Sequence, residues 1–198
     1  MKLGFIGCGN MATAIIKGIL ANGIAGKDDI IGADLSEAVR NKINGDLGIQ
    51  VTIDNKEAAA KAEVLFLSVK PQFYETVIGE IKDVVTDTQL IITIAPGKTL
   101  DWLDKQFGKS LKIVRTMPNT PALVGEGITA ACYNDNVSGA DLDKAVTILT
   151  SFGKCEVVPE HLMDVVTSVS GSSPAYVFMF IEAMADAAVA DGMPRAQA

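Results

Sequence analysis

Leu3-Gly-Phe-Ile-Gly-Cys-Gly-Asn-Met-Ala12 is the stretch of this sequence that decides its fold. A short apolar run leads into a Gly7-x-Gly9-x-x-Ala12 loop, and a helical pattern follows at once. Gly7 allows a tight turn, Gly9 lets a ligand approach the backbone, and Ala12 is small enough for the helix to pack closely on the strand. The free N–H groups at the start of such a helix favour a phosphate group.

The residues that follow the loop strengthen this interpretation. Apolar residues recur at helical spacing directly after it, at Met11, Ile15, Ile16, Ile19 and Leu20. A second strand-like run then ends at Asp34, 22 residues past Ala12, where a dinucleotide-binding fold places the acid that meets the adenosine ribose. The order strand, loop, helix, strand and acid therefore predicts a dinucleotide site. A secretory signal is disfavoured because Asn10, Thr13 and Lys17 interrupt the apolar segment.

Composition narrows the class of protein. The 198 residues are 48% hydrophobic and 21% charged, which is typical of a folded globular chain of one or two domains. The net charge is −7 and no basic cluster stands out, so neither a nucleic acid nor a membrane is an expected partner. Cys8, Cys132 and Cys155 are too far apart for a metal or redox motif, which favours a reducing, cytoplasmic setting, and the single His161 is expected at the surface.

Strand-like runs alternate with helical patterns along residues 1–159. The predicted strands are residues 2–6, 29–34, 50–52, 64–69, 89–94, 111–116, 128–133 and 155–158. The predicted helices are residues 10–22, 36–44, 55–61, 71–84, 99–107 and 140–152. Several strand runs are apolar without alternation, as in strands that are covered on both faces. The pattern predicts an α/β fold with a doubly wound parallel sheet.

From about Glu160 the pattern becomes helical only, and the run Ser170-Gly-Ser-Ser-Pro174 predicts a break in it. Ser173 and Pro174 predict the cap and first turn of a helix over residues 175–190, and residues 194–198 predict the start of another. The long helix is apolar nearly all round, yet it is too short and too acidic in the middle for a membrane span. We expect it to be buried against other helices or another subunit. The helical segment that precedes it in residues 160–198 is interrupted, and it cannot bury the apolar surface of the long helix. We therefore expect either a truncated chain or a partner molecule that buries this surface.

Polar and small residues follow three predicted strands, at the edge where open parallel sheets bind ligands. They are Ser68, Val69, Lys70 and Pro71 after the fourth strand, Ala95, Pro96 and Gly97 after the fifth, and Asn119 and Thr120 after the sixth. Lys70 could be a solvated charge, but its position beside the predicted phosphate-binding loop favours a functional role. The other two groups could be ordinary turns. Asn55 either caps its helix or reaches the adenosine side.

Four blocks taken together resemble the pyrroline-5-carboxylate reductase family. They are Gly4-Phe-Ile-Gly-Cys-Gly-Asn-Met11, Ser68-Val-Lys-Pro-Gln72, Arg115-Thr-Met-Pro-Asn-Thr-Pro121 and Ser170-Gly-Ser-Ser-Pro-Ala-Tyr-Val177. The resemblance covers the whole chain. It implies a Rossmann-type domain over residues 1–159 and an incomplete all-helical dimerisation domain over residues 160–198. It further implies reduction of 1-pyrroline-5-carboxylate to L-proline with NADPH or NADH, in a homodimer or higher homo-oligomer.

The resemblance also assigns expected roles to residues. The pyrophosphate is expected at Ile6, Gly7, Cys8, Gly9, Asn10 and Met11. Asp34 is expected at the adenosine ribose, Asn55 near the adenine, and Ser68, Val69, Lys70 and Pro71 along the cofactor cleft. Ala95, Pro96 and Gly97 are expected near the nicotinamide, with Asn119 and Thr120 on the substrate side. No metal site is expected, and no residue is assigned as a proton donor.

Two departures from the family pattern qualify these expectations. Ser173 stands where the family usually has glycine, and the Ser-Pro-Gly-Gly-Thr-Thr segment that holds the substrate carboxylate in the family is not among these residues. We therefore expect this chain to bind a dinucleotide but to turn substrate over poorly. The negative charge of Asp34 favours NADH, whereas members of the family usually use NADPH. Either cofactor therefore stays open.

Two other functions remain possible from the sequence. One is a related β-hydroxyacid or imine dehydrogenase, although such enzymes typically use a lysine on a helix of the second domain and residues 160–198 contain no lysine. The other is a non-catalytic dinucleotide-binding module.

Overall fold

The computed structural model describes all 198 residues, and its centre is one eight-stranded sheet. The strand order is β3-β2-β1-β4-β5-β6-β7-β8. The strands are β1 (Leu3–Ile6), β2 (Ile30–Ala33), β3 (Gln50–Thr52), β4 (Val64–Leu67), β5 (Leu90–Thr93), β6 (Lys112–Met117), β7 (Gly127–Tyr133) and β8 (Gly153–Val157). All neighbouring pairs are parallel except β6 and β7. The predicted strands and the doubly wound sheet are confirmed, with this one antiparallel pair as a correction.

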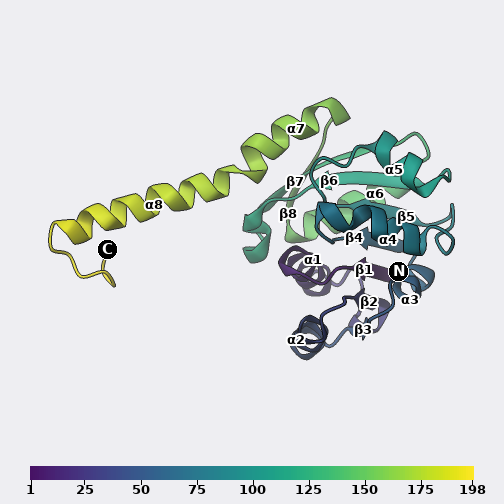
Figure 1. Ribbon diagram of the computed structural model, residues 1–198, viewed down its shortest axis with the longest axis horizontal. Helices are drawn as coiled ribbons and strands as arrows, with labels where there is room; N and C mark the ends of the chain where they lie inside the picture. Colours follow the sequence, from purple (N-terminus) through teal and green to yellow (C-terminus); the bar gives the residue numbers. More distant parts are fainter.

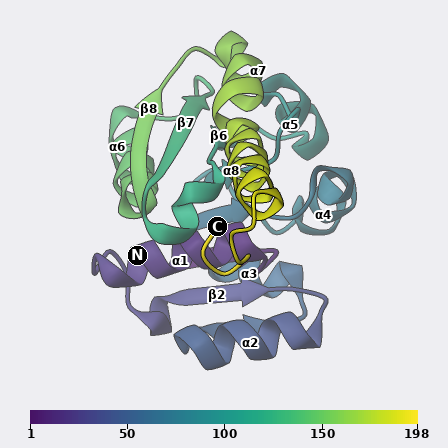
Figure 2. The ribbon, with the colours of Figure 1, turned by 90° about the vertical axis from the view of Figure 1, so that its left-hand side faces the viewer.

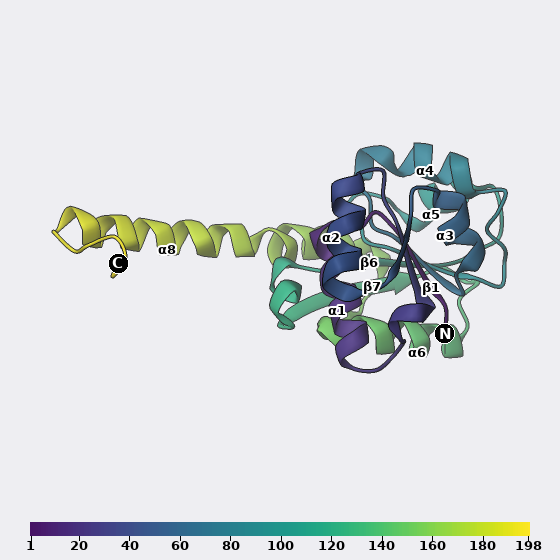
Figure 3. The same ribbon diagram turned by 90° about the horizontal axis from the view of Figure 1, so that it is seen from below.

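Helices cover both faces of the sheet (Figure 3). The α-helices are α1 (Asn10–Ala21), α2 (Glu37–Leu47), α3 (Asn55–Lys61), α4 (Tyr74–Ile81), α5 (Leu100–Phe107), α6 (Gly139–Leu149), α7 (Met163–Val166) and α8 (Ser173–Ala190). Short turns of helix, η1 (Lys27–Asp29), η2 (Pro71–Phe73), η3 (Thr120–Val124), η4 (Thr150–Phe152), η5 (Glu160–Leu162) and the π-helical η6 (Thr167–Gly171), join them. One core lies under α1, α2 and α6, and the other lies under α3, α4 and α5.

The central strands are fully buried because both of their faces carry apolar side chains. β1, β2, β4 and β5 have no exposed residue, and Phe5 stacks on Phe66 with ring centroids 4.6 Å apart. Burial of this kind is the main favourable contribution to folding. It fixes the sheet rigidly, so the loops at the carboxyl ends of the strands start from well-defined positions.

Gly4 shows how closely α3 packs on β1. A Cβ at Gly4 would lie 2.7 Å from the carbonyl oxygen of Ala58 and 2.8 Å from Cβ of Ala62. We predict that Gly4→Ala lowers the free energy of unfolding by about 2 kcal/mol, because backbone and helix must move apart. Gly45→Ala is the matched control: it lies in α2, where a Cβ meets nothing within 4 Å, and should raise stability by about 0.5 kcal/mol. Chemical denaturation measures both, and equal effects would contradict the prediction.

A buried arginine joins the sheet to the carboxyl-terminal helices. The side chain of Arg115 on β6 is 3% exposed, and its Nη1 donates to Oε1 of Glu160 at 2.9 Å. The same Glu160 oxygen accepts a bond from the backbone N–H of Leu100, at the start of α5. The ion pair therefore fixes the point where the chain leaves the sheet and enters η5.

Beyond this joint, α8 projects far from the rest of the molecule (Figure 1). Figure 2 looks nearly along α8 and shows that it continues from α7. The predicted break at Ser170–Pro174 is only the π-helical η6 and a turn, and Ser173 is not a cap: its hydroxyl donates to the carbonyl of Val169. Residues 194–198 form a hydrogen-bonded turn, not the predicted helix.

The expectation that α8 is buried is wrong for the isolated chain. No residue of α8 is buried, and Phe178, Met179 and Phe180 are each well over half exposed. The expectation that this helix is too short for a membrane span is corrected, because the continuous helical stretch Glu160–Ala190 is long and apolar enough by length and composition. Helices of soluble proteins also pass this test, so it is weak evidence for a membrane. The exposed apolar side chains of α8 form a continuous surface, unlike the isolated apolar side chains that are common on soluble proteins. Such a surface marks an interaction site.

Candidate cofactor site

A cavity of about 400 Å³ lies at the carboxyl ends of β1, β2 and β4. This is the edge at which ligands bind in open α/β sheets. The lining residues are Gly7, Gly9, Ala33, Asp34, Leu35, Ser36, Asn55, Ser68, Val69, Lys70, Phe73, Thr76, Val77 and Glu80. The structure thus brings together seven of the residues proposed for the cofactor: Gly7, Gly9, Asp34, Asn55, Ser68, Val69 and Lys70.

Gly7 makes the turn that follows β1. Its φ is +90°, a conformation that side chains other than glycine rarely adopt, and its N–H donates to the carbonyl of Ala33 at 2.8 Å. A Cβ there would lie 2.8 Å from the backbone of Ser68. Gly7 is therefore required by the protein's own packing.

Gly9 has a different role, because neither conformation nor packing requires a glycine there. Its backbone is extended, with φ −70° and ψ −170°, and a Cβ would meet nothing within 4 Å. Gly9 lines the cavity and precedes α1 without providing a side-chain cap, so the first N–H groups of α1 are available to a ligand. Open space at this point fits a diphosphate, which supports a dinucleotide as the occupant.

Cys8 and Ile6 were also proposed for the cofactor, but both side chains are buried and neither residue lines the cavity. The Cys8 thiol is buried and lies 3.6 Å from the carbonyl of Ala33. Burial, together with the nearby Asp34 carboxylate, raises the pKa of the Cys8 thiol to about 12, so the thiol stays neutral. The Ile6 side chain is buried in the core, and its carbonyl accepts bonds from the N–H and the hydroxyl of Ser68.

Asp34 is held rigidly at the end of β2. Its Oδ2 accepts a bond from the backbone N–H of Cys8 at 2.9 Å, and its Oδ1 accepts one from the backbone N–H of Ser36 at 2.9 Å. One carboxylate therefore links the glycine loop to the start of α2. The position agrees with the ribose role proposed for it.

Asn55 lies in the first turn of α3, but it does not cap that helix. Asp54 is the cap, since its side chain accepts the N–H of Lys56. The Asn55 amide instead donates to Oε2 of Glu80 on α4 at 2.7 Å. The capping interpretation of Asn55 is wrong, and its place in the cavity wall agrees with the adenine side.

The sequence did not indicate several residues of this cavity. They are Leu35, Ser36, Phe73, Thr76, Val77 and Glu80. Leu35 and Phe73 are strongly exposed apolar side chains in the cavity wall. Such side chains are typical of a site that binds a flat apolar group such as adenine. The helical spacing of Phe73, Val77 and Glu80 places them on one face, but only the fold shows that this face looks into the cavity.

The other proposed residues lie outside this cavity. Asn10 and Met11 form the first turn of α1, and Pro71 begins η2. Ala95, Pro96 and Gly97 follow β5 at the same edge of the sheet, with Ala95 buried. None of these six reaches the cavity wall, so their roles stay predictions.

Asn119 and Thr120 follow β6, as predicted, and Asn119 contacts the protein itself. Its Oδ1 accepts the N–H of Ile128 at 2.9 Å, and its Nδ2 donates to the Ser170 hydroxyl at 3.3 Å. Asn119 therefore ties the end of β6 to the π-helical η6 at the base of α8. Thr120 begins η3, and no side-chain bond fixes it.

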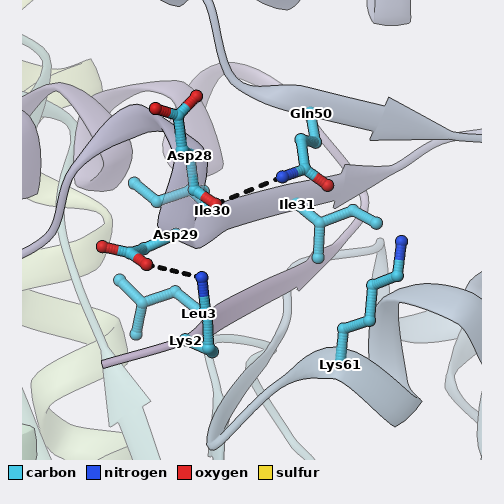
Figure 4. A pocket seen from close by; sticks show the side chains of 8 residues that line it. All are labelled: Lys2, Leu3, Asp28, Asp29, Ile30, Ile31, Gln50 and Lys61. Carbon is cyan, nitrogen blue, oxygen red and sulfur yellow. Dashed lines mark hydrogen bonds and ion pairs between the residues drawn. The ribbon is translucent and has the colours of Figure 1, made fainter.

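A second cavity, of about 260 Å³, lies at the opposite edge of the sheet (Figure 4). Its polar groups bind one another. Lys2 pairs with Asp29 at 2.6 Å, and the Gln50 amide donates to the carbonyl of Asp28 at 3.1 Å. Because these groups are already satisfied and lie at the amino ends of β1 and β2, the cavity beside Gly9 is the better candidate site.

Comparison with known proteins decides the family. The family described as "Pyrroline-5-carboxylate reductase dimerisation" matches residues 160–198, and that described as "NADP oxidoreductase coenzyme F420-dependent" matches residues 2–97. The pyrroline-5-carboxylate reductase of Escherichia coli (strain K12) is 45% identical over 197 residues, which span 100% of this chain and 73% of that protein. The chain belongs to the pyrroline-5-carboxylate reductase family. It is therefore an NAD(P)-dependent oxidoreductase.

Other members of the family agree in sequence and in structure. The Arabidopsis thaliana pyrroline-5-carboxylate reductase is 34% identical over 98% of this chain and 70% of its own length. A solved Plasmodium falciparum pyrroline carboxylate reductase with NADP bound is 34% identical, with a TM-score of 0.90 over 100% of this chain and 72% of that one. A prephenate dehydrogenase from Aquifex aeolicus is only 18% identical, and its TM-score of 0.71 shows a shared fold alone.

Proposed function

We propose that this chain is a pyrroline-5-carboxylate reductase, which reduces the C=N bond of 1-pyrroline-5-carboxylate to give L-proline in proline biosynthesis. The 45% identity to the Escherichia coli reductase over the whole chain carries the proposal. The cavity beside Gly9 supports it, because its open space and the free N–H groups of α1 suit a dinucleotide.

The proposed chemistry is hydride transfer, and the nicotinamide ring supplies the hydride when the cofactor is bound. The task of the protein is to hold two rings together and to exclude water. Gly9 and the start of α1 hold the diphosphate. Asp34 accepts hydrogen bonds from the ribose hydroxyls, and Lys70 lines the same cavity. Ala95, Pro96, Gly97 and Thr120 are proposed toward the nicotinamide and substrate, with Asn119 as a positioning residue through its bonds to Ile128 and Ser170.

The proposed organisation has two domains. Residues 1–159 form the dinucleotide-binding domain, and residues 160–198 belong to a helical dimerisation domain, with α8 as the surface on which a second copy packs. The exposed apolar side chains of α8 support a homo-oligomer. The three free cysteines agree with the cytoplasm as the site of action.

Oxidation of NADH and NADPH in the presence of 1-pyrroline-5-carboxylate tests the proposal. We expect loss of reduced nicotinamide only when the imine is present, with L-proline as the product. Prephenate and a 3-hydroxy acid are the matched controls, since dehydrogenases of similar fold are named for such substrates. Neither control should be oxidised when the oxidised cofactor is supplied. Turnover of a control substrate without turnover of the imine would contradict the assignment.

A further inference from the structure

We propose that Asp34 makes this chain select the dinucleotide without a 2′-phosphate, NADH, over NADPH. The inference rests on the proposed function only in that the cavity beside Gly9 holds a dinucleotide. It does not follow from the family, because a solved relative holds NADP.

The first argument is the rigid placement of the Asp34 carboxylate. Both of its oxygens accept backbone N–H bonds, from Cys8 and from Ser36, so the side chain cannot turn away from an incoming ligand without losing both. A carboxylate fixed at the end of the second strand accepts hydrogen bonds from the two ribose hydroxyls. The same carboxylate repels a 2′-phosphate, which carries negative charge and has no proton donor to offer.

The second argument is the charge of the whole cavity wall. Its charged side chains are Asp34, Glu80 and Lys70. Lys70 follows β4, and β1 lies between β4 and β2, so about 10 Å of sheet separates Lys70 from the end of β2. The adenosine side is therefore lined by carboxylates, and the lysine stands nearer to the diphosphate.

The third argument concerns Arg40, the cation that lies closest along the chain to Asp34. Its Nη1 donates to the carbonyl oxygens of Asp34 and Leu35, at 2.6 Å and 3.0 Å. The guanidinium is thus bound to the main chain that follows β2, and it does not line the cavity. It stabilises the loop that carries Asp34 and leaves the carboxylate to face the ribose.

Binding of ADP-ribose and of ADP-ribose 2′-phosphate, measured by titration calorimetry, tests the inference without any turnover. The two probes differ only in the 2′-phosphate, and neither contains nicotinamide. We expect the phosphate to weaken binding to the wild-type chain about tenfold or more, which corresponds to about 1.4 kcal/mol. In Asp34→Asn the ratio of the two dissociation constants should move about tenfold toward the phosphorylated probe.

Glu37→Gln is the matched control, since Glu37 lies in the first turn of α2, is exposed and does not line the cavity; it should leave the ratio unchanged. Equal or tighter binding of the phosphorylated probe by the wild-type chain overturns the inference, even if Asp34→Asn does not fold. An unchanged ratio in a folded Asp34→Asn also overturns it. If the chain discriminates between the probes but does not reduce 1-pyrroline-5-carboxylate, the proposed reaction is contradicted. The inference about Asp34 is then still supported.

Discussion

Gly9→Val is expected to weaken NADH binding at least about 100-fold, a loss of about 2.7 kcal/mol. A Cβ at Gly9 meets no protein atom within 4 Å, so the valine methyl groups enter the open space in which the diphosphate is proposed to lie. Because the space is open and the backbone is extended, the free energy of unfolding should change by less than about 1 kcal/mol. Quenching or enhancement of nicotinamide fluorescence measures the binding, and thermal unfolding measures the stability.

Gly139→Val is the control for this substitution. Gly139 also stands at the start of a helix, α6, and a Cβ there also meets nothing within 4 Å. It lies outside the cavity, so NADH affinity should not change. Unaltered NADH affinity in Gly9→Val, or an equal loss in both variants, would remove the glycine loop from the binding site.

Phe180→Glu is expected to convert a wild-type oligomer into a monomer, with self-association weakened about 1,000-fold or more, or about 4 kcal/mol. Phe180 is 66% exposed and lies on α8 among Val177, Ile181 and Met184, which are all exposed as well. A new carboxylate at the centre of such an interface is buried without a partner, which costs several kcal/mol. Analytical ultracentrifugation over a range of concentrations measures the effect.

Ile53→Glu is the control for the interface. Ile53 is an exposed apolar residue that follows β3, far from α8 along the chain. Its substitution adds the same charge to the surface and should leave assembly unchanged. A wild-type chain that sediments as a monomer at all concentrations would contradict the role given to α8.

The parallel part of the sheet could be predicted because its strands are short apolar runs between helical patterns, and β1 to β6 lie where these runs were found. The antiparallel pairing of β7 was missed, although the sequence holds a signal for it. Only residues 118–126 separate β6 from β7, which is shorter than the dozen or more residues that a parallel crossover needs. Length of connection was therefore more informative than composition at this point.

The glycine loop and Asp34 could be predicted because their spacing along the chain is local. Asn55 was assigned to the adenine side by the resemblance, but its partner Glu80 could not be predicted, because the two residues are 25 positions apart and meet only when α3 packs beside α4. Ser173 was misread because a Ser-Gly-Ser-Ser-Pro run has the composition of a loop, whereas in the structure this run forms the end of the π-helical η6 and the first residues of α8. Local composition cannot reveal a turn that is stabilised by bonds such as Asn119 to Ser170.

A crystal structure of this chain with NADH bound tests the central claim most directly. The account predicts the diphosphate beside Gly9, within hydrogen-bonding distance of the N–H groups of Asn10 and Met11, and the adenosine ribose hydroxyls on the carboxylate of Asp34. An ordered NADH at any other place, with the cavity beside Gly9 empty, would contradict it.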